Sequence, residues 1–116
     1  MQELAGKVAV VTGAGSGIGL GMARAFAAGN MRLVLADIES EALAGAATEL
    51  GAGGAEVITV VTDVADPAAV ETLAERAYSA FGAVNVLCNN AGVIENNRAT
   101  WEYSLEDWNW VLGINL

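Results

Sequence analysis

The sequence predicts a doubly wound α/β fold, in which helices cover both faces of a parallel sheet. Short apolar runs rich in β-branched residues alternate with helical patterns of about a dozen residues, and this alternation is typical of parallel strands joined by right-handed crossovers. The chain has 116 residues, of which 54% are hydrophobic and 16% charged, so it can bury one core but not two. We therefore expect one domain over residues 1–116.

Four of the apolar runs are predicted to be strands. They cover residues 7–12, 32–36, 57–61 and 84–88. Each run is short and continuously apolar, as expected for a strand that is buried on both faces of a parallel sheet.

Two helices are predicted between the first three strands, because apolar residues recur there at helical spacing. The first pattern consists of Ile18, Met22, Ala25 and Phe26 and stops at Gly29-Asn30. The second pattern ends at Gly51 and consists of Ala42, Leu43, Ala46, Ala47 and Leu50.

A third helix is predicted before the last strand. Asp66 is a suitable N-cap and Pro67 a suitable first helical residue, because proline needs no hydrogen bond for its nitrogen there. The apolar stripe of this helix consists of Val70, Leu73, Ala74, Ala77 and Phe81.

A fourth helix is predicted to begin at Ser104, because Ser104-x-x-Asp107 is similar to a capping box. The chain ends at Leu116, about three turns later, without a stop signal. We therefore expect the fold to be truncated after about four strands and the start of the fourth helix, as part of a longer enzyme. Such a piece should be prone to aggregation, because the open sheet edge carries unpaired backbone groups.

Charge and cysteine content exclude several classes of partner. The net charge is −9, from 14 acidic and 5 basic residues, and it repels nucleic acids and anionic membrane surfaces. Apolar residues 8–11 are too few to cross a membrane. Cys88 is the single cysteine and histidine is absent, so we expect no metal site, a buried Cys88 and a reducing, cytoplasmic location.

A glycine-rich segment joins the first strand to the first helix. Its residues Gly13, Gly15, Ser16, Gly17, Ile18 and Gly19 form a GxxxGxG pattern. Glycines at this point let backbone N–H groups approach a pyrophosphate at the positive end of the helix, so the segment is a candidate phosphate site. The alternative is a purely structural tight turn.

Asp37 closes the second strand, 18 positions after Gly19. A carboxylate at about this offset can accept hydrogen bonds from the hydroxyls of the adenosine ribose. Neither Ser16 nor Ile38 is basic, so no cation stands nearby to balance the 2′-phosphate of NADP. This favours NAD. The alternative role for Asp37 is that of N-cap for the following helix.

Together with Asp63-Val64 and Asn89-Asn90-Ala91-Gly92, these motifs occur in an order that resembles the classical short-chain dehydrogenase/reductase family from end to end. The resemblance implies a Rossmann-like sheet. It also implies that Asp63 bonds the adenine amino group, that Val64 flanks the adenine ring, and that Asn90, Ala91 and Gly92 line the adenosine and ribose side of the cofactor.

The resemblance further implies hydride transfer between NAD(H) and a small-molecule secondary alcohol or ketone, in a protein that forms a homo-oligomer at full length. It assigns Asn115 a supporting catalytic role, holding a water behind the active-site lysine; the alternative for Asn115 is a capping or exposed amide. The family's Tyr-x-x-x-Lys pair is absent, since Gly82 and Asp107 follow Tyr78 and Tyr103 at that spacing. We therefore expect these 116 residues alone to be inactive.

Two other functions remain open at this point. One is a noncatalytic nucleotide-binding or assembly module. The other is a Rossmann-like methyltransferase, which also uses a glycine turn and an acidic residue after the second strand. Thr12 and the Asn89–Gly92 motif argue against the methyltransferase.

Overall fold

The computed structural model describes residues 4–90. Along this part of the chain, strands and helices alternate as the sequence predicts. The elements are β1 (Val8–Thr12), α1 (Gly17–Ala28), β2 (Arg32–Asp37), α2 (Ser40–Ala52), β3 (Val57–Val61), α3 (Pro67–Phe81) and β4 (Val86–Cys88).

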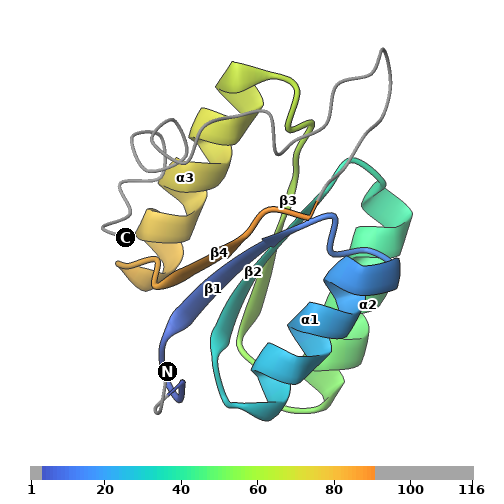
Figure 1. Ribbon diagram of the computed structural model, residues 1–116, viewed down its shortest axis with the longest axis vertical. Helices are drawn as coiled ribbons and strands as arrows, with labels where there is room; N and C mark the ends of the chain where they lie inside the picture. Colours follow the sequence, from blue (N-terminus) through green and yellow to red (C-terminus); the bar gives the residue numbers. More distant parts are fainter. Residues whose placement is uncertain (1–3, 91–116) are drawn as a thin grey trace.

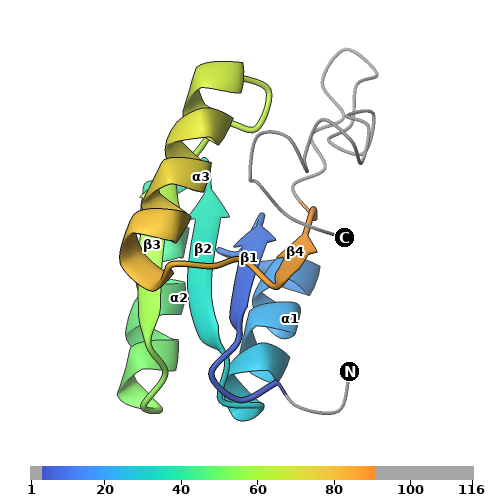
Figure 2. The same ribbon diagram turned by 90° about the vertical axis from the view of Figure 1, so that its left-hand side faces the viewer.

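The strands form one parallel sheet in the order β3-β2-β1-β4. Helices α1 and α2 pack on one face of this sheet and α3 packs on the other (Figures 1 and 2). The prediction of a doubly wound α/β fold is therefore confirmed. The two central strands, β1 and β2, are buried most completely, because they have a neighbour on each side as well as helices on their faces.

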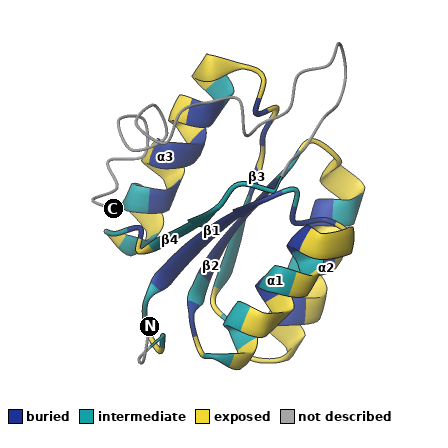
Figure 3. Cartoon of the chain, in the orientation of Figure 1, coloured by how far each residue is buried: buried dark blue, intermediate teal, exposed yellow. Residues whose placement is uncertain are grey.

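Alternating residues of the strands divide the core into two halves. Val8, Val10 and Val34 point towards α3, where they meet Leu73 and Ala77. The intervening residues Ala9, Val11, Leu33 and Leu35 belong to the half under α1 and α2. Figure 3 shows β1 buried along its length, while the helices turn exposed residues outwards.

The third helix begins and ends as its sequence predicts. Asp66 is its N-cap and accepts a hydrogen bond of 3.0 Å from the backbone N–H of Ala68, and Pro67 is the first helical residue. Gly82 ends the helix in a left-handed conformation, with φ 75°.

The buried face of α1 differs in part from the prediction. Ile18 is 75% exposed and Ala25 is also exposed, whereas Gly19 and Ala23 are buried. The other two predicted residues, Met22 and Phe26, pack against the core as expected. A step of one residue turns the direction of a side chain by about 100° around a helix, so Ile18 and Ala25 fall outside the buried face although Met22 and Phe26 lie on it. The face of α1 is set by Gly19, which lies against the end of β1.

The start of β4 also differs from the prediction, because β4 begins at Val86 rather than at residue 84. Asn85 precedes it and pairs with Val8 through both its backbone and its side chain: the Asn85 N–H donates to the Val8 carbonyl at 2.9 Å, and Asn85 Oδ1 accepts from the Val8 N–H at 2.9 Å. The side chain thus takes the place of a ladder partner. Val84 is nevertheless buried.

An ion pair joins the two helices that share one face of the sheet. Arg24 of α1 donates to both carboxylate oxygens of Glu49 of α2, over 2.7 and 2.8 Å. These hydrogen bonds, together with the positive charge of Arg24, lower the pKa of Glu49. The pair is exposed to solvent, so it adds to the alignment of α1 and α2 more than to stability.

Several sequence predictions fall outside the described residues: the helix from Ser104 onwards, Ala91, Gly92 and Asn115. Within residues 4–90, no helix is both long enough and apolar enough to cross a membrane. The same range contains no group of three or more acidic, cysteine or histidine side chains placed to hold a metal ion.

Candidate functional site

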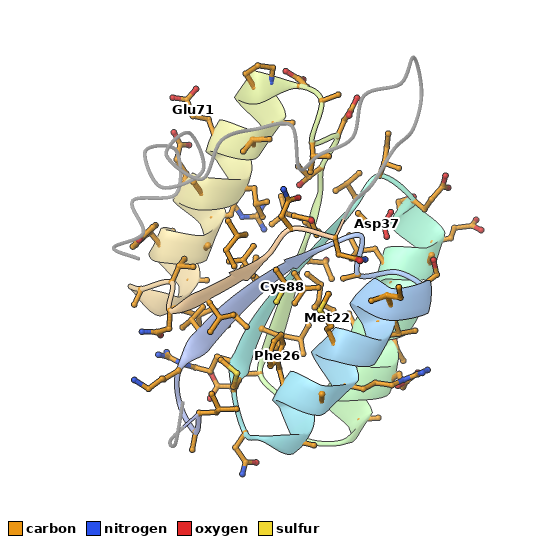
Figure 4. The ribbon with its side chains drawn as sticks, viewed as in Figure 1. Met22, Phe26, Asp37, Glu71 and Cys88 are labelled. Carbon is orange, nitrogen blue, oxygen red and sulfur yellow. The ribbon has the colours of Figure 1, made fainter. Side chains whose placement is uncertain are left out.

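The residues that the sequence analysis singled out gather at one edge of the sheet. Because all four strands are parallel, the segments that follow them leave the sheet at the same end (Figure 1). This edge holds the glycine-rich loop after β1, Asp37 as the last residue of β2, Asp63 after β3 and Asn90 after β4. Figure 4 shows Asp37 at this edge, near the first turns of α2. Open α/β sheets bind their ligands at this edge.

The glycines of the loop serve two different needs. Gly13 and Gly17 have φ values of 65° and 59°, which side chains with a β-carbon rarely adopt. Gly19 is needed for space: a methyl group placed on it would overlap the Gly13 carbonyl oxygen and would lie 2.8 Å from Asn90 Nδ2. The first turn of α1 therefore packs directly on the backbone at the end of β1.

The amino end of α1 has no negative group of its own. The N-cap residue, Ser16, makes no side-chain hydrogen bond to the helix, and the first turn holds no acidic residue. The positive end of the helix dipole and the first N–H groups of α1 are therefore left for an anion. A diphosphate fits this arrangement. The exposed residue Ile18 is the second residue of α1, within the turn whose N–H groups would bind it.

Asp37 is held by two backbone amides. Its Oδ2 accepts from the Gly15 N–H at 2.8 Å and its Oδ1 accepts from the Glu39 N–H at 3.1 Å. Asp37 is not the N-cap of α2, which was its alternative role. Glu39 occupies that position, and its side chain makes no capping hydrogen bond. The neighbouring Ile38 is 54% exposed, and Ser16 is exposed as well. The carboxylate is thus fixed in direction, with no cation at these two positions.

Of the two residues predicted to bind adenine after β3, Asp63 lies at the surface and Val64 in the core. Asp63 is exposed, and its Oδ1 accepts from the Ala65 N–H at 2.9 Å. Val64 is only 4% exposed and packs with Val70 and Leu73 beneath α3. An adenine ring bound here would therefore meet the main chain of Val64 rather than its side chain.

The structure adds Thr12, which the site prediction did not include. Thr12 is fully buried at the end of β1, and its Oγ1 accepts from the Asn90 N–H at 2.9 Å. Its own hydroxyl hydrogen can reach either the Cys88 carbonyl oxygen at 3.4 Å or Asn89 Oδ1 at 3.3 Å. Thr12 thereby fastens the segment after β4 to the glycine-rich loop. The sequence signal that could have indicated this role is the hydroxyl of Thr12 at the end of an otherwise apolar strand.

Replacing Thr12 with valine is expected to destabilise the protein by about 1–2 kcal/mol, because the isosteric methyl group can neither donate nor accept. The Asn90 N–H would keep only its 3.1 Å contact with the Cys88 carbonyl. Thr12→Ser, which retains the hydroxyl, is the matched control and should lose less. Urea unfolding of the full-length protein measures both changes; equal stability of the valine variant and the native protein would contradict the role of the hydroxyl.

Cys88 lies half-buried against the core under α1 and α2, and burial raises the pKa of its thiol. The thiol is therefore protonated at neutral pH and a poor nucleophile. This agrees with the interpretation of Cys88 as a packing residue.

Comparison with known proteins places this geometry in context. The sequence profile described as short chain dehydrogenase matches residues 7–116. The chain is 43% identical over 108 residues to 1-deoxy-11-beta-hydroxypentalenate dehydrogenase of Streptomyces avermitilis. The matched region covers 92% of this chain and 40% of that protein.

Solved structures agree with the sequence comparison. A short chain dehydrogenase/reductase from Burkholderia phymatum in complex with NAD superposes with a TM-score of 0.78 and 50% identity, covering 97% of this chain and 40% of the other. L-Sorbose reductase from Gluconobacter frateurii, complexed with NADPH and L-sorbose, gives a TM-score of 0.75 and 39% identity, covering 93% and 42%. The chain thus spans about two fifths of the length of these relatives.

Proposed function

Because the chain belongs to the short-chain dehydrogenase family, we propose that it forms the NAD-binding part of an oxidoreductase that moves a hydride between NAD(H) and a small secondary alcohol or ketone. Membership of this family overturns the methyltransferase alternative. The three relatives named above are a dehydrogenase, a dehydrogenase/reductase and a reductase, which supports redox chemistry for the full-length protein.

The choice of NAD over NADP depends mainly on one observation: the Asp37 carboxylate, held by the Gly15 and Glu39 amides, faces no basic residue at Ser16 or Ile38. A carboxylate binds a ribose diol well but repels a 2′-phosphate, unless a cation compensates. One structural relative is complexed with NAD and another with NADPH, so family membership leaves this choice to the residues at the site.

The remaining contacts follow from the same edge of the sheet. The N–H groups at the start of α1 would bind the diphosphate through the positive end of the helix. Asp63 would accept from the adenine amino group beside the main chain of Val64. Asn90, Ala91 and Gly92 would line the ribose side.

The bound nicotinamide would supply the hydride acceptor or donor. The chain's own contribution would be to hold the dinucleotide in place, and Asn115 would support the proton relay by holding a water. We expect the tyrosine and lysine that exchange the substrate's proton to lie elsewhere in the full-length protein, which we propose to be a cytoplasmic homo-oligomer without nucleic-acid or membrane partners.

Titration of the full-length protein with NADH and with NADPH, followed by nucleotide fluorescence, tests this proposal. We expect NADH to bind at least about tenfold more tightly, which corresponds to roughly 1.4 kcal/mol. Absence of binding by both nucleotides would contradict the proposed function. Binding without NAD reduction by any of a panel of secondary alcohols would favour the noncatalytic module.

A further inference from the structure

Gly15 lies where the glycine-rich loop, α2 and Asp37 meet. A methyl group placed on Gly15 would be 2.9 Å from Ala42 Cβ and 2.9 Å from Asp37 Oδ2, closer than real β-carbons approach other atoms. Gly15 is not among the glycines with positive φ. It is therefore required by lack of space, and the space is taken up by Ala42 and Asp37.

Ala42 is not required for the core of the protein. It is the third residue of α2 and only half-buried, while Leu43, Ala46 and Leu50 make the buried contacts of this helix with the sheet. The methyl group of Ala42 instead lies against Gly15, whose N–H donates to Asp37 Oδ2 at 2.8 Å. A larger side chain at position 42 would press on Gly15 and would thereby disturb the N–H that holds Asp37 Oδ2.

We propose that Ala42 is a positioning residue that sets cofactor specificity by keeping Asp37 Oδ2 on the Gly15 amide; this inference rests on the proposed function. A carboxylate offers about four acceptor sites, and the Gly15 and Glu39 amides use two of them. The two that remain can accept from adjacent hydroxyl groups. Rotation of the carboxylate would turn these two acceptor sites away from the 2′- and 3′-hydroxyls of an NADH ribose. NADPH carries a phosphate in place of the 2′-hydroxyl, so its binding does not depend on this alignment.

The test uses the full-length protein and two substitutions of the same kind on α2. Ala42→Leu should weaken NADH binding by about tenfold, the loss expected for one hydrogen bond to a charged group, and NADPH binding by less than about threefold. The control is Ala44→Leu, at an exposed position of the same helix, which should change neither. A purely structural effect of Ala42→Leu would lower the melting temperature and weaken both nucleotides alike, and this result would overturn the inference.

Two further variants show whether the effect passes through Asp37. In an Asp37→Ala background, Ala42→Leu should weaken NADH binding no further; an undiminished additional loss overturns the inference. Gly15→Ala should weaken NADH binding more than NADPH binding, because the added methyl group would lie 2.9 Å from Asp37 Oδ2 and would displace the carboxylate. Ala42→Val, a smaller enlargement, decides the question if Ala42→Leu does not fold: it should weaken NADH binding more than NADPH binding, and equal effects on the two nucleotides overturn the inference.

The two proposals fail in different ways. If the native protein binds neither NADH nor NADPH, the proposed function is wrong and the inference falls with it. If the native protein prefers NADH and Asp37→Ala removes that preference, but Ala42→Leu has no effect, only the role of Ala42 is wrong.

Discussion

Replacement of Gly19 with alanine is expected to destabilise the protein by about 3 kcal/mol and to abolish nucleotide binding. The added methyl group would overlap the Gly13 carbonyl oxygen and lie 2.7 Å from the Gly13 carbonyl carbon. Both atoms belong to the backbone directly after the central strand β1, so they cannot move aside as a flexible side chain could. The first turn of α1 would have to leave the loop, and its N–H groups would no longer point at a diphosphate.

Gly21→Ala is the matched control, because Gly21 lies in the same helix and a methyl group there would meet nothing within 4 Å. Alanine has the higher helix propensity, so this variant should be more stable by up to about 1 kcal/mol and should bind NADH as before. Urea unfolding and NADH titration measure both variants. A Gly19→Ala protein as stable as the native one would show that α1 does not pack on the loop as described.

The strands were predictable because each is a short run of apolar residues with a simple local signature. Their order in the sheet is a different matter: Ala9 pairs with Leu33 on one side and with Val86 on the other, across long separations in the chain. No local pattern carries that information. The resemblance to a known family implied a Rossmann-like sheet, but the register of each strand pair is known only from the structure.

The errors in α1 and β4 have a common origin, because each depends on a contact with β1. The orientation of α1 follows from the close approach of Gly19 to Gly13, and apolar periodicity does not register a glycine as a buried position. The shortened β4 follows from the side chain of Asn85, which replaces a strand pairing at Val8. Both are tertiary effects that override a local pattern.

The candidate site was predictable to the level of residue types. Glycines before a helix and an acidic residue after the second strand indicate a dinucleotide site by their chemistry and spacing. The two hydrogen bonds that hold Asp37, and the contact of Gly15 with Ala42, were not predictable, because they depend on how closely α2 approaches the loop. The role of Thr12 was missed for the same reason, since its partners follow β4, more than 70 residues later.

Asp37→Asn is expected to reverse the nucleotide preference of the full-length protein. The amide keeps an oxygen for the Gly15 N–H, so the loop should stay in place, although the Glu39 N–H loses its acceptor. The ribose diol loses its charged acceptor, so NADH should bind about tenfold more weakly. A 2′-phosphate would no longer meet a negative charge. Two unit charges 4 Å apart near a protein surface repel by up to about 4 kcal/mol before screening, so NADPH should bind at least about tenfold more tightly.

The combined change in the ratio of the two affinities is then about 100-fold, and fluorescence titration with both nucleotides measures it directly. Asp66→Asn is the control: it removes the same charge from an exposed residue, and asparagine caps a helix as well as aspartate does. If Asp66→Asn shifted the ratio as much as Asp37→Asn, the preference would arise from the net charge of −9 rather than from one carboxylate beside the ribose. If neither variant shifted it, the preference would have to arise at residues other than Asp37.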